Sequence, residues 1–427
     1  MLSLGLMSGT SMDGIDAALL ETDGEQQIHE CGAVKLNYTT ETRCLFKAAE
    51  RAFKLAQGRA AQADASYLQA LHDYFKHELQ LVMPHLLQDE VLRLTDYLNQ
   101  QLGLTGALTL AKVTQHSTRL HADAVHQLLA QTGKMKADID VIGYHGQTLY
   151  HQPAAKITVQ MGDGRLLAQL TGIKVVNEFR QRDVSEGGQG APFAPLYHQA
   201  LAHVGNKLPL VVVNCGSIAN MSVIPSACMD DLVGFDTGPG NGLIDALIKQ
   251  RTHGRECMDE NGQYGRQGRV DDFVLQALHA RALPFKDNFF DKKPPKSLDI
   301  RDMVLIPELQ WMALTDACKT LEVFTAKTVV DSLELLDTPL HAIPRHWILA
   351  GGGWYNPVIR SELELRLKQK LACEIKVQTA TEAGWNSDAM EAQLFAYLAV
   401  RSLKNLPLSV PGTTGVPIPL CGGYVYG

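Results

Sequence analysis

The sequence predicts a two-domain α/β protein, and three observations support this prediction. Apolar segments of strand length, beginning with LSLGLM at 2–7, end in glycine-rich loops. Segments with helical spacing of apolar residues follow them. Near Pro209 a new buried strand begins and the strand, loop and helix order restarts. With 427 residues and 45% hydrophobic residues, the chain can bury more than one core. We expect domains at 1–205 and 206–427.

In the first half, strands and helices are expected in a definite order. The first 40 residues read as three strands, LSLGLM, GIDAALLET and HECGAVKL, which indicates an antiparallel start. Residues 64–82 and 89–132 have helical spacing, with a helical insertion expected near 83–118. DVIGYHGQTLY and GIKVVNEF are expected to be later strands of the same domain.

In the second half, LPLVVVNCGSIANMSVIP is expected to form strands, and LVGFDTGPGNGLIDALIKQ a strand, a loop and a helix. A long helix over 314–336 precedes the strand in HWILAGGGWYNP. The last long helix is expected near 387–404, packed at the domain junction. Its small face, Ala392, Ala396 and Ala399, would let another element approach closely.

Charge and cysteine usage exclude several classes of protein. The net charge of −7 comes without a long block of like charge, so the chain lacks the basic footprint of a nucleic-acid binder. The eight cysteines form no CxxC pair, which is typical of reduced thiols in the cytosol. No basic leader precedes an apolar segment, and no stretch approaches the roughly 20 apolar residues that cross a bilayer. We expect a soluble, cytoplasmic protein with neither nucleic-acid nor membrane partners.

The loop MSGTSMDGID, residues 7–16, is unusual for a simple connection between strands. Gly9 and Gly14 let a backbone approach a ligand, while Thr10 and Ser11 add hydroxyl donors. Asp13 would repel a bare phosphate, so its presence favours a phosphate accompanied by Mg²⁺, with Asp13 as the metal-side residue. The alternative is an ordinary hairpin, because turns use the same residue types.

Three further glycine clusters follow strands. Gly216 lies in NCGSIAN, and Gly238 and Gly240 lie in DTGPGNGLIDAL at the entrance to a helix, where backbone N–H groups favour an anion. Gly351 and Gly352 could let an adenine or ribose lie against the backbone. Neither GxxxxGK[ST] nor a GxGxxG that opens the first helix of a βαβ unit occurs. We therefore expect nucleotide binding by two facing hairpin loops.

The order of these loops resembles the actin, hexokinase and heat-shock-chaperone ATPase superfamily, which has a ribonuclease-H-like fold. Several local motifs go further and resemble the 1,6-anhydro-N-acetylmuramic acid kinase family, in that family's order across almost the whole chain. These motifs are MSGTSMDGID (7–16), HGQT (145–148), FRQRD with GGQGAP (179–192), DTGPGN (236–241), PPKS (294–297), AGGGWYNP (350–357) and DAMEAQLFAYLA (388–399).

The resemblance implies a fold, a reaction and a set of site residues. It implies an active cleft between the domains and a homodimer. It also implies an enzyme that uses ATP and water to open the 1,6-anhydro ring of its sugar and phosphorylate O6, giving N-acetylmuramate 6-phosphate in cell-wall recycling. Asp183 matches the general base of the family. The ATP-phosphate loop of the family matches Gly9, Thr10, Ser11, Met12, Asp13, Gly14, Ile15 and Asp16.

The residues around Asp183 allow two interpretations. If NEFRQRD is extended, Asp183 ends a strand beside a glycine loop, and the nearby arginines would keep it ionised to accept a proton from water. An isolated RxRD would ordinarily be a salt bridge of Asp183 with Arg180 or Arg182. We assign Arg182, His145 and Gln147 to the sugar site, although a single histidine at a strand end is more often structural.

Three departures from the family pattern leave rival functions open. Ser217 follows Gly216 where two glycines are usual, LDIRDM (298–303) follows PPKS, and the stretch near 83–118 is longer than usual. That stretch has an oligomeric or regulatory role, or it simply covers a neighbouring helix. The rivals are a sugar kinase acting on a free hydroxyl, with Asp183 deprotonating that hydroxyl, and a non-catalytic nucleotide or sugar sensor.

Overall fold

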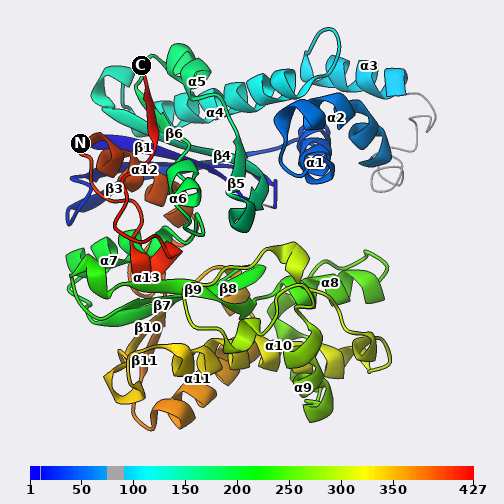
Figure 1. Cartoon of the computed structure of the whole chain (residues 1–427), viewed down its shortest axis with the longest axis vertical. Helices are drawn as coiled ribbons and strands as arrows, with labels where there is room; N and C mark the ends of the chain where they lie inside the picture. Colours follow the sequence, from blue (N-terminus) through cyan, green and yellow to red (C-terminus); the bar gives the residue numbers. More distant parts are fainter. Residues whose placement is uncertain (10, 75–90) are drawn as a thin grey trace. The chain divides into compact units, whose positions relative to one another are not determined.

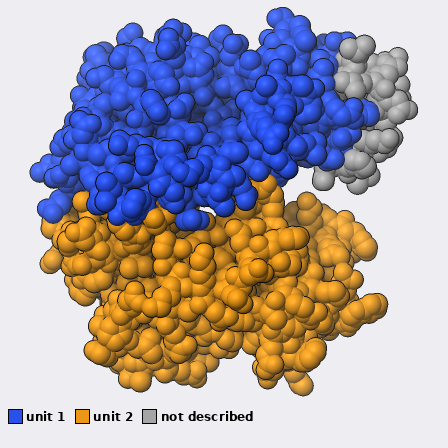
Figure 2. All heavy atoms as spheres, viewed as in Figure 1, with its two compact units in different colours: residues 1–190, 389–409, 416–427 blue, residues 191–388, 410–415 orange. Residues whose placement is uncertain are grey.

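The chain forms two compact units in a computed structural model that describes residues 1–9, 11–74 and 91–427, with the backbone alone at 91–94. The first unit comprises residues 1–190, 389–409 and 416–427 (Figures 1 and 2). The second comprises residues 191–388 and 410–415. Each unit has its own sheet and its own hydrophobic core.

The sheet of the first unit has the strand order β12-β6-β4-β1-β2-β3, with β5 paired to β4. β1, β2 and β3 form an antiparallel meander, and β4 and β6 run parallel to β1. The strands are β1 (Leu2–Ser8), β2 (Gly14–Thr22), β3 (Ile28–Asn37), β4 (Val141–Gln152), β5 (Ile157–Met161), β6 (Val175–Asn177) and β12 (Tyr424–Tyr426).

Helices cover both faces of this sheet. Leu4 and Leu6 of β1 point into the core that includes buried residues of α1 and α4, whereas Gly5 between them faces α12. α12 therefore packs on the opposite face from α1 and α4. The helices of the unit are α1 (Thr40–Leu55), α2 (Ala60–Tyr74), α3 (Val91–Leu102), α4 (Leu110–Thr132), α5 (Gly164–Thr171), α6 (Gln181–Ser185) and α12 (Met390–Leu403).

The second unit repeats the strand arrangement of the first. Its sheet has the order β11-β10-β7-β8-β9, again with an antiparallel meander followed by parallel strands. The strands are β7 (Leu210–Cys215), β8 (Ile218–Ile224), β9 (Val233–Pro239), β10 (His346–Ala350) and β11 (Lys376–Thr379). The helices are α7 (Ala194–Val204), α8 (Gly242–Arg251), α9 (Asp272–Arg281), α10 (Leu314–Asp331), α11 (Pro357–Leu371) and α13 (Pro411–Thr414). The repeated order confirms the two-sheet, ribonuclease-H-like α/β prediction.

The division into units differs from the expected boundary between residues 205 and 206. α7 contacts β8, so the second unit begins at residue 191. The last long helix, expected at 387–404 in the C-terminal domain, is α12 and belongs to the first unit. The reason is a close approach: a Cβ on Gly5 would lie 1.8 Å from Ala392 O, and one on Gly143 would lie 2.0 Å from Phe395 O.

The expected extended conformation of NEFRQRD is wrong. β6 ends at Asn177, and Glu178 has a positive φ of 57° that turns the chain out of the sheet. Asp183 consequently lies on the short helix α6 and not at a strand end.

The stretch near 83–118 is described only from residue 91. There α3 contacts α1 and α2, with Leu98 buried in the core, and Tyr97 Oη donates to Glu41 Oε1 at 3.2 Å. This described part covers neighbouring helices. Residues 83–90 lie outside the described part of the chain.

The close contact of α12 with the sheet predicts a sharp difference between two glycine variants. Gly143→Ala should destabilise the protein by about 3 kcal/mol, because its methyl group would overlap the backbone of α12. Gly352→Ala is the matched control, since a Cβ there meets no atom within 4 Å. Urea unfolding of both variants measures the difference, and equal stabilities would contradict this packing.

Candidate active site

The loop between β1 and β2 is open at one glycine and tightly packed at the other. Met12 N donates to Gly9 O at 3.1 Å, which closes the turn. A Cβ on Gly9 would have only Ser11 Oγ nearby, at 3.6 Å, so a ligand can approach this backbone. A Cβ on Gly14 would lie 2.5 Å from Leu36 O, so this glycine serves the pairing of β2 with β3. Thr10, expected to supply a hydroxyl, lies outside the described residues.

The other predicted residues of this loop divide into core and surface. The side chains of Met12 and Ile15 are buried in the core, so only their backbones can serve a nucleotide. Asp16 lies within β2, opposite Met7 on one side and Lys35 on the other. The assignment of these residues to nucleotide binding stays a prediction.

Asp13 is held by two donors at the end of the loop. Ser11 Oγ donates to Asp13 Oδ1, and Lys35 Nζ contacts Oδ2, each at 2.7 Å. Partial burial opposes ionisation, but the hydrogen bonds from Lys35 and Ser11 outweigh it and leave the pKa of Asp13 below its ordinary value. The carboxylate is therefore charged at neutral pH and suits a hydrated cation. Lys35 was missed from the sequence, because only the β2–β3 register brings it here.

Gln147 braces the loop from the neighbouring strand β4. Its Oε1 accepts from Ser8 Oγ at 2.6 Å, and its Nε2 donates to Gly9 O at 3.1 Å. Tyr38 Oη donates to the same Ser8 hydroxyl at 2.9 Å. Gln147 is fully buried, so its amide positions the phosphate-loop candidate. Its predicted sugar contact stays a prediction.

Asp183 is buried against the glycine loop that follows α6. It is 2% exposed, and Gly190 N donates to its Oδ1 at 2.6 Å. A Cβ on Gly188 would lie 2.2 Å from the same oxygen, so only glycine fits there. Arg180 NH1 donates to Gly190 O at 2.5 Å, which holds this loop from the other side. Arg182, the neighbour assigned to the sugar, is exposed on α6.

His145 supports Arg180. Its Nδ1 contacts Gly146 O at 2.8 Å, and Arg180 Nε donates to its Nε2 at 3.0 Å. Burial, and then the positive Arg180, hold the pKa of His145 well below its ordinary value. The ring is thus neutral and lies 4.5 Å from the Phe395 ring, centroid to centroid. Both ring nitrogens are engaged within the first unit, so the structure gives His145 a supporting place, and its sugar contact stays a prediction.

In the second unit, two predicted loops are bonded to each other. Gly240 N and Gly242 N donate to Ser217 O at 3.0 and 3.2 Å, and Asn241 N donates to Gly216 O at 2.9 Å. The expectation that the N–H groups at the entrance to α8 are available to an anion is therefore wrong for these residues. A Cβ on Gly216 meets only Ile218 O, at 4.0 Å, so this glycine is open.

Of the remaining predicted glycines, three are packed against protein atoms and one is open. A Cβ on Gly238 would lie 2.8 Å from Thr328 Oγ1, and one on Gly240 would lie 2.0 Å from Gly216 O, so both are needed for packing. Gly351 has a φ of 88° and packs against Cys215 O, whereas a Cβ on Gly352 meets nothing within 4 Å. Three of the four predicted glycine loops thus present one open glycine each, Gly9, Gly216 and Gly352, and the DTGPGN loop presents none.

The PPKS segment (294–297) and the residue after it contact β9, the strand that carries Gly238. The sequence did not predict these contacts. Asp236 N donates to Lys296 O at 3.0 Å, and Leu298 N donates to Asp236 Oδ2 at 2.7 Å. Burial raises the pKa of Asp236 to about 7 and lowers that of Lys296 to about 8. The unusual segment after Ser297 therefore begins by anchoring the strand that carries Gly238.

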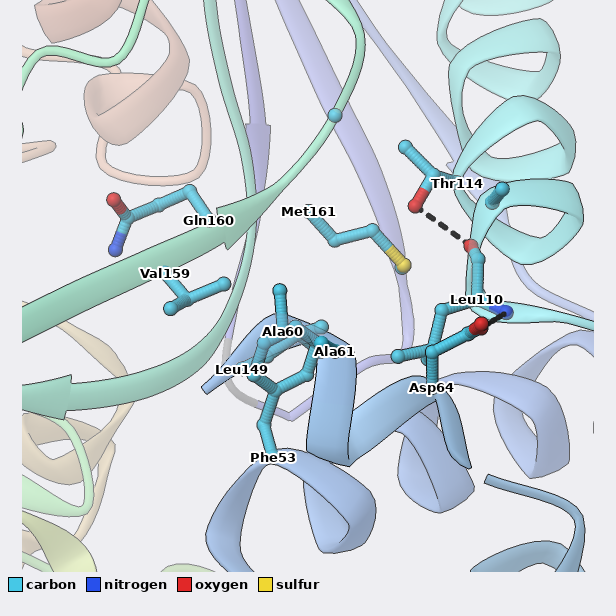
Figure 3. A pocket seen from close by; sticks show the side chains of 12 residues that line it. Phe53, Ala60, Ala61, Asp64, Leu110, Thr114, Leu149, Val159, Gln160 and Met161 are labelled. Atoms are coloured by element: carbon cyan, nitrogen blue, oxygen red, sulfur yellow. Dashed lines mark hydrogen bonds between the residues drawn. The ribbon is translucent and has the colours of Figure 1, made fainter. Parts of the chain in front are cut away.

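A separate cavity of about 430 Å³ lies in the first unit between α1, α2, α4 and the β4–β5 hairpin (Figure 3). Figure 3 shows the Asp64 carboxylate turned to the amide of Leu110, whose N–H donates to Oδ1 at 3.0 Å. Its lining, among the described residues, contains this acid and no lysine or arginine. The cavity does not suit an anionic ligand. Its full lining is Phe53, Ala60, Ala61, Asp64, Leu110, Ala111, Thr114, Leu149, Val159, Gln160, Met161 and Gly162.

The described residues contain neither a membrane-spanning helix nor a cluster of metal-ligating side chains. No helix there is long and apolar enough to cross a membrane. Nor does that part of the chain contain a group of three or more histidine, cysteine, aspartate or glutamate residues placed to hold a metal ion.

The fold and the site define an α/β protein with two ribonuclease-H-like units and open glycine loops in both. The model of the anhydro-N-acetylmuramic acid kinase family matches residues 59–427. The anhydro-N-acetylmuramic acid kinase of Nitrobacter winogradskyi is 39% identical over 428 residues, covering 100% of this chain and 99% of that one. That of Methylorubrum populi is 38% identical over 424 residues, covering 99% and 98%. The chain belongs to the anhydro-N-acetylmuramic acid kinase family.

Solved structures with similar folds are distant. Component A of the Acidaminococcus fermentans (R)-2-hydroxyglutaryl-CoA dehydratase has a TM-score of 0.40 at 10% identity, covering 94% of this chain and 99% of that one. A ROK family glucokinase from Streptomyces griseus, in complex with glucose and AMPPNP, has a TM-score of 0.36 at 12% identity, covering 93% and 99%. These similarities are too weak to inform the site.

A buried carboxyl group in the second unit predicts a pH dependence of stability. Glu322 on α10 accepts from Asn356 Nδ2 at 2.6 Å, and Asn356 also caps α11 after the Gly351–Gly353 loop. Burial raises the pKa of Glu322 from its ordinary 4.5 to about 8; the Asn356 hydrogen bond opposes this, and the nearby Asp259 adds to it. The folded state then keeps a proton that the unfolded chain has released, so stability falls as pH rises between these values.

Glu322→Gln should remove this contribution. Its melting temperature should fall less than that of the wild type between pH 6 and pH 9, as measured by differential scanning calorimetry. Glu334→Gln is the control, because Glu334 is 59% exposed and pairs with Lys370 at the surface. A wild-type pH dependence retained in Glu322→Gln would refute the assignment.

Proposed function

We propose that the protein is an ATP-dependent kinase that opens the 1,6-anhydro ring of 1,6-anhydro-N-acetylmuramic acid and phosphorylates O6. The products would be N-acetylmuramate 6-phosphate and ADP, in peptidoglycan recycling in the cytoplasm. Family membership over the whole chain supports the substrate and the use of ATP. The observation that carries the chemistry is the buried Asp183, held in one orientation by Gly190 N.

Asp183 would act as the general base. It accepts a proton from a water molecule, and the water oxygen bonds to the anomeric carbon C1 as the C1–O6 bond breaks. O6 leaves C1 with the bonding electron pair and takes the γ-phosphoryl group of ATP. Glycoside hydrolysis usually needs an acid to protonate the leaving oxygen. Here phosphoryl transfer to O6 replaces that proton.

The nucleotide would be held mainly by backbone. Within the predicted glycine loops, the backbone is open to a ligand at Gly9 in the first unit and at Gly216 and Gly352 in the second. Mg²⁺ would offset the negative charge of the phosphates. The charged Asp13 fits a hydrated cation, and a metal held largely by phosphates and water needs few protein ligands. We also propose a homodimer, on the family resemblance alone.

Ser217 gives little support to a non-catalytic sensor. Its side chain is exposed, and its carbonyl makes the two hydrogen bonds that lock the glycine loops together. The residue therefore fits the loop without crowding it. The same geometry at Asp183 would also serve a kinase acting on a free sugar hydroxyl, so identification of the substrate decides between the two reactions.

Asp183→Asn should abolish most turnover and leave nucleotide binding intact. Asparagine can still accept the hydrogen bond from Gly190 N, but it cannot take a proton, so kcat should fall roughly 10²- to 10⁴-fold. Turnover is followed by mass spectrometry of the phosphosugar, and ADP binding by calorimetry. Asp163→Asn is the control, because asparagine replaces aspartate well at the N-cap of α5. Phosphorylation by Asp183→Asn at the wild-type rate would exclude the general-base role.

A further inference from the structure

A partly buried chain of hydrogen bonds runs from the β4–β5 hairpin to the loop beside Asp183. Gln160 Nε2 donates to Thr158 Oγ1 at 2.8 Å. Thr158 Oγ1 lies 2.9 Å from His151 Nδ1, and His151 Nε2 lies 3.0 Å from Gln189 O. Thr158 is 4% exposed, whereas His151, Gln160 and Gln189 are half-buried. Of these residues, Gln160 also lines the cavity in Figure 3, where its side chain leaves β5 on the side opposite to Val159.

The acceptor at Nε2 fixes the direction of one of these hydrogen bonds. Gln189 O can only accept, so the proton of His151 is on Nε2. The hydroxyl of Thr158 accepts from Gln160 and has its own hydrogen to give to His151 Nδ1. The imidazole is thereby held with a proton on Nε2 and with Nδ1 facing the Thr158 hydroxyl.

The last step of the chain passes through a single peptide group. The carbonyl held by His151 belongs to Gln189, and the N–H of the same peptide unit belongs to Gly190, which donates to Asp183 Oδ1 at 2.6 Å. A peptide group is planar, so fixing its oxygen also fixes the direction of its N–H. A donor on the carbonyl side also strengthens the hydrogen bond on the other side.

Gly190 is confined from several directions. Its φ is 69°, and a Cβ would lie 2.6 Å from Val184 Cγ2 and 2.9 Å from His151 Cε1. Arg180 NH1 holds its carbonyl. His151 contacts the carbonyl of the Gln189–Gly190 peptide group, and Arg180 contacts the carbonyl of the next peptide group. Together these two contacts set the orientation of the Gln189–Gly190 peptide.

We propose that Thr158 and His151 are positioning residues for the reaction: the Thr158 hydroxyl holds the His151 ring so that its Nε2–H meets Gln189 O, which aims the Gly190 N–H at Asp183 and so orients the reacting carboxylate. This inference rests on the proposed role of Asp183 as general base. Neither residue touches the substrate in this account. Their effect reaches the reaction through the peptide group alone.

The test compares Thr158→Val with Thr158→Ser. Valine keeps the volume but loses the hydroxyl, so His151 Nδ1 loses this partner and the ring can turn away, which weakens the hydrogen bond from Nε2–H to Gln189 O. We expect kcat for the anhydrosugar to fall roughly 10- to 100-fold, the size of effect that a small misplacement of a reacting group produces. KM for the sugar and for ATP should change less than twofold. Serine keeps the hydroxyl and should restore kcat to within about threefold of wild type.

Nitrogen NMR of imidazole-labelled protein gives a second readout that does not need turnover. The wild type and Thr158→Ser should show a His151 Nε2–H proton protected from exchange by its hydrogen bond to Gln189 O, and in Thr158→Val this proton should exchange faster. In glycine-labelled protein, the Gly190 amide proton should move upfield in Thr158→Val as its hydrogen bond to Asp183 weakens. If Thr158 had only a structural role, both variants would lose stability, and the His151 and Gly190 signals would not differ between valine and serine.

Three outcomes would overturn the inference: an unchanged kcat in Thr158→Val, a serine variant no better than valine, or a rise in KM equal to the fall in kcat. If the proposed function itself is wrong, the wild type forms no phosphosugar, which distinguishes this result from a failure of the positioning role. In that case an unchanged Gly190 amide in Thr158→Val would still refute the positioning role.

Discussion

The backbone contact between α12 and the sheet of the first unit is the constraint on which the site depends. Gly5 and Gly143 bring the helix so close that Phe395 O occupies the space where a Cβ of Gly143 would lie. This closeness sets the Phe395 ring against His145. His145 in turn accepts from Arg180, and Arg180 holds the Gly190 carbonyl beside Asp183. A helix near the end of the chain thus supports a carboxylate in its middle.

Electrostatics in this chain of contacts favour a fixed arrangement. A protonated His145 would face the guanidinium of Arg180, and burial already disfavours its charge, so the ring stays neutral and can accept a hydrogen bond. Burial lowers the pKa of Arg180 to about 10, while Glu391 and Asp183 oppose this, and Arg180 remains charged at neutral pH. Buried polar networks of this kind are rigid when their members are satisfied.

Much of the fold could be predicted from local pattern, because strand and helix periodicities and glycine loops are local signals. The three N-terminal strands, the restart near Pro209 and the small face of the last helix were all visible in the sequence. The partner of that helix was not, because Gly5 and Gly143 meet it only after the chain has returned from residue 389. The extended conformation expected near Asp183 failed because Glu178 adopts a positive φ that no residue pattern signalled.

In the candidate site, too, the sequence predicted local turns but not the tertiary contacts around them. Glycines point to sharp turns, but the sequence does not say whether a glycine leaves room for a ligand or for a neighbouring backbone. Gly9, Gly216 and Gly352 are open, whereas Gly14, Gly238, Gly240 and Gly351 are packed against protein atoms. Lys35 and Thr158 reach the site regions through strand register, so no motif could have identified them. Lys296 lies in the PPKS motif, but its contact with Asp236 could not be predicted from the motif.

The most direct test of the central claim is the fate of the water oxygen. The protein, Mg-ATP and 1,6-anhydro-N-acetylmuramic acid are incubated briefly in ¹⁸O-water, with unlabelled N-acetylmuramate 6-phosphate in the same water as a control for exchange. The account predicts a phosphosugar with one ¹⁸O at C1 and none in its phosphate. A phosphosugar without label at C1, or ¹⁸O released in inorganic phosphate with the sugar intact, would contradict it.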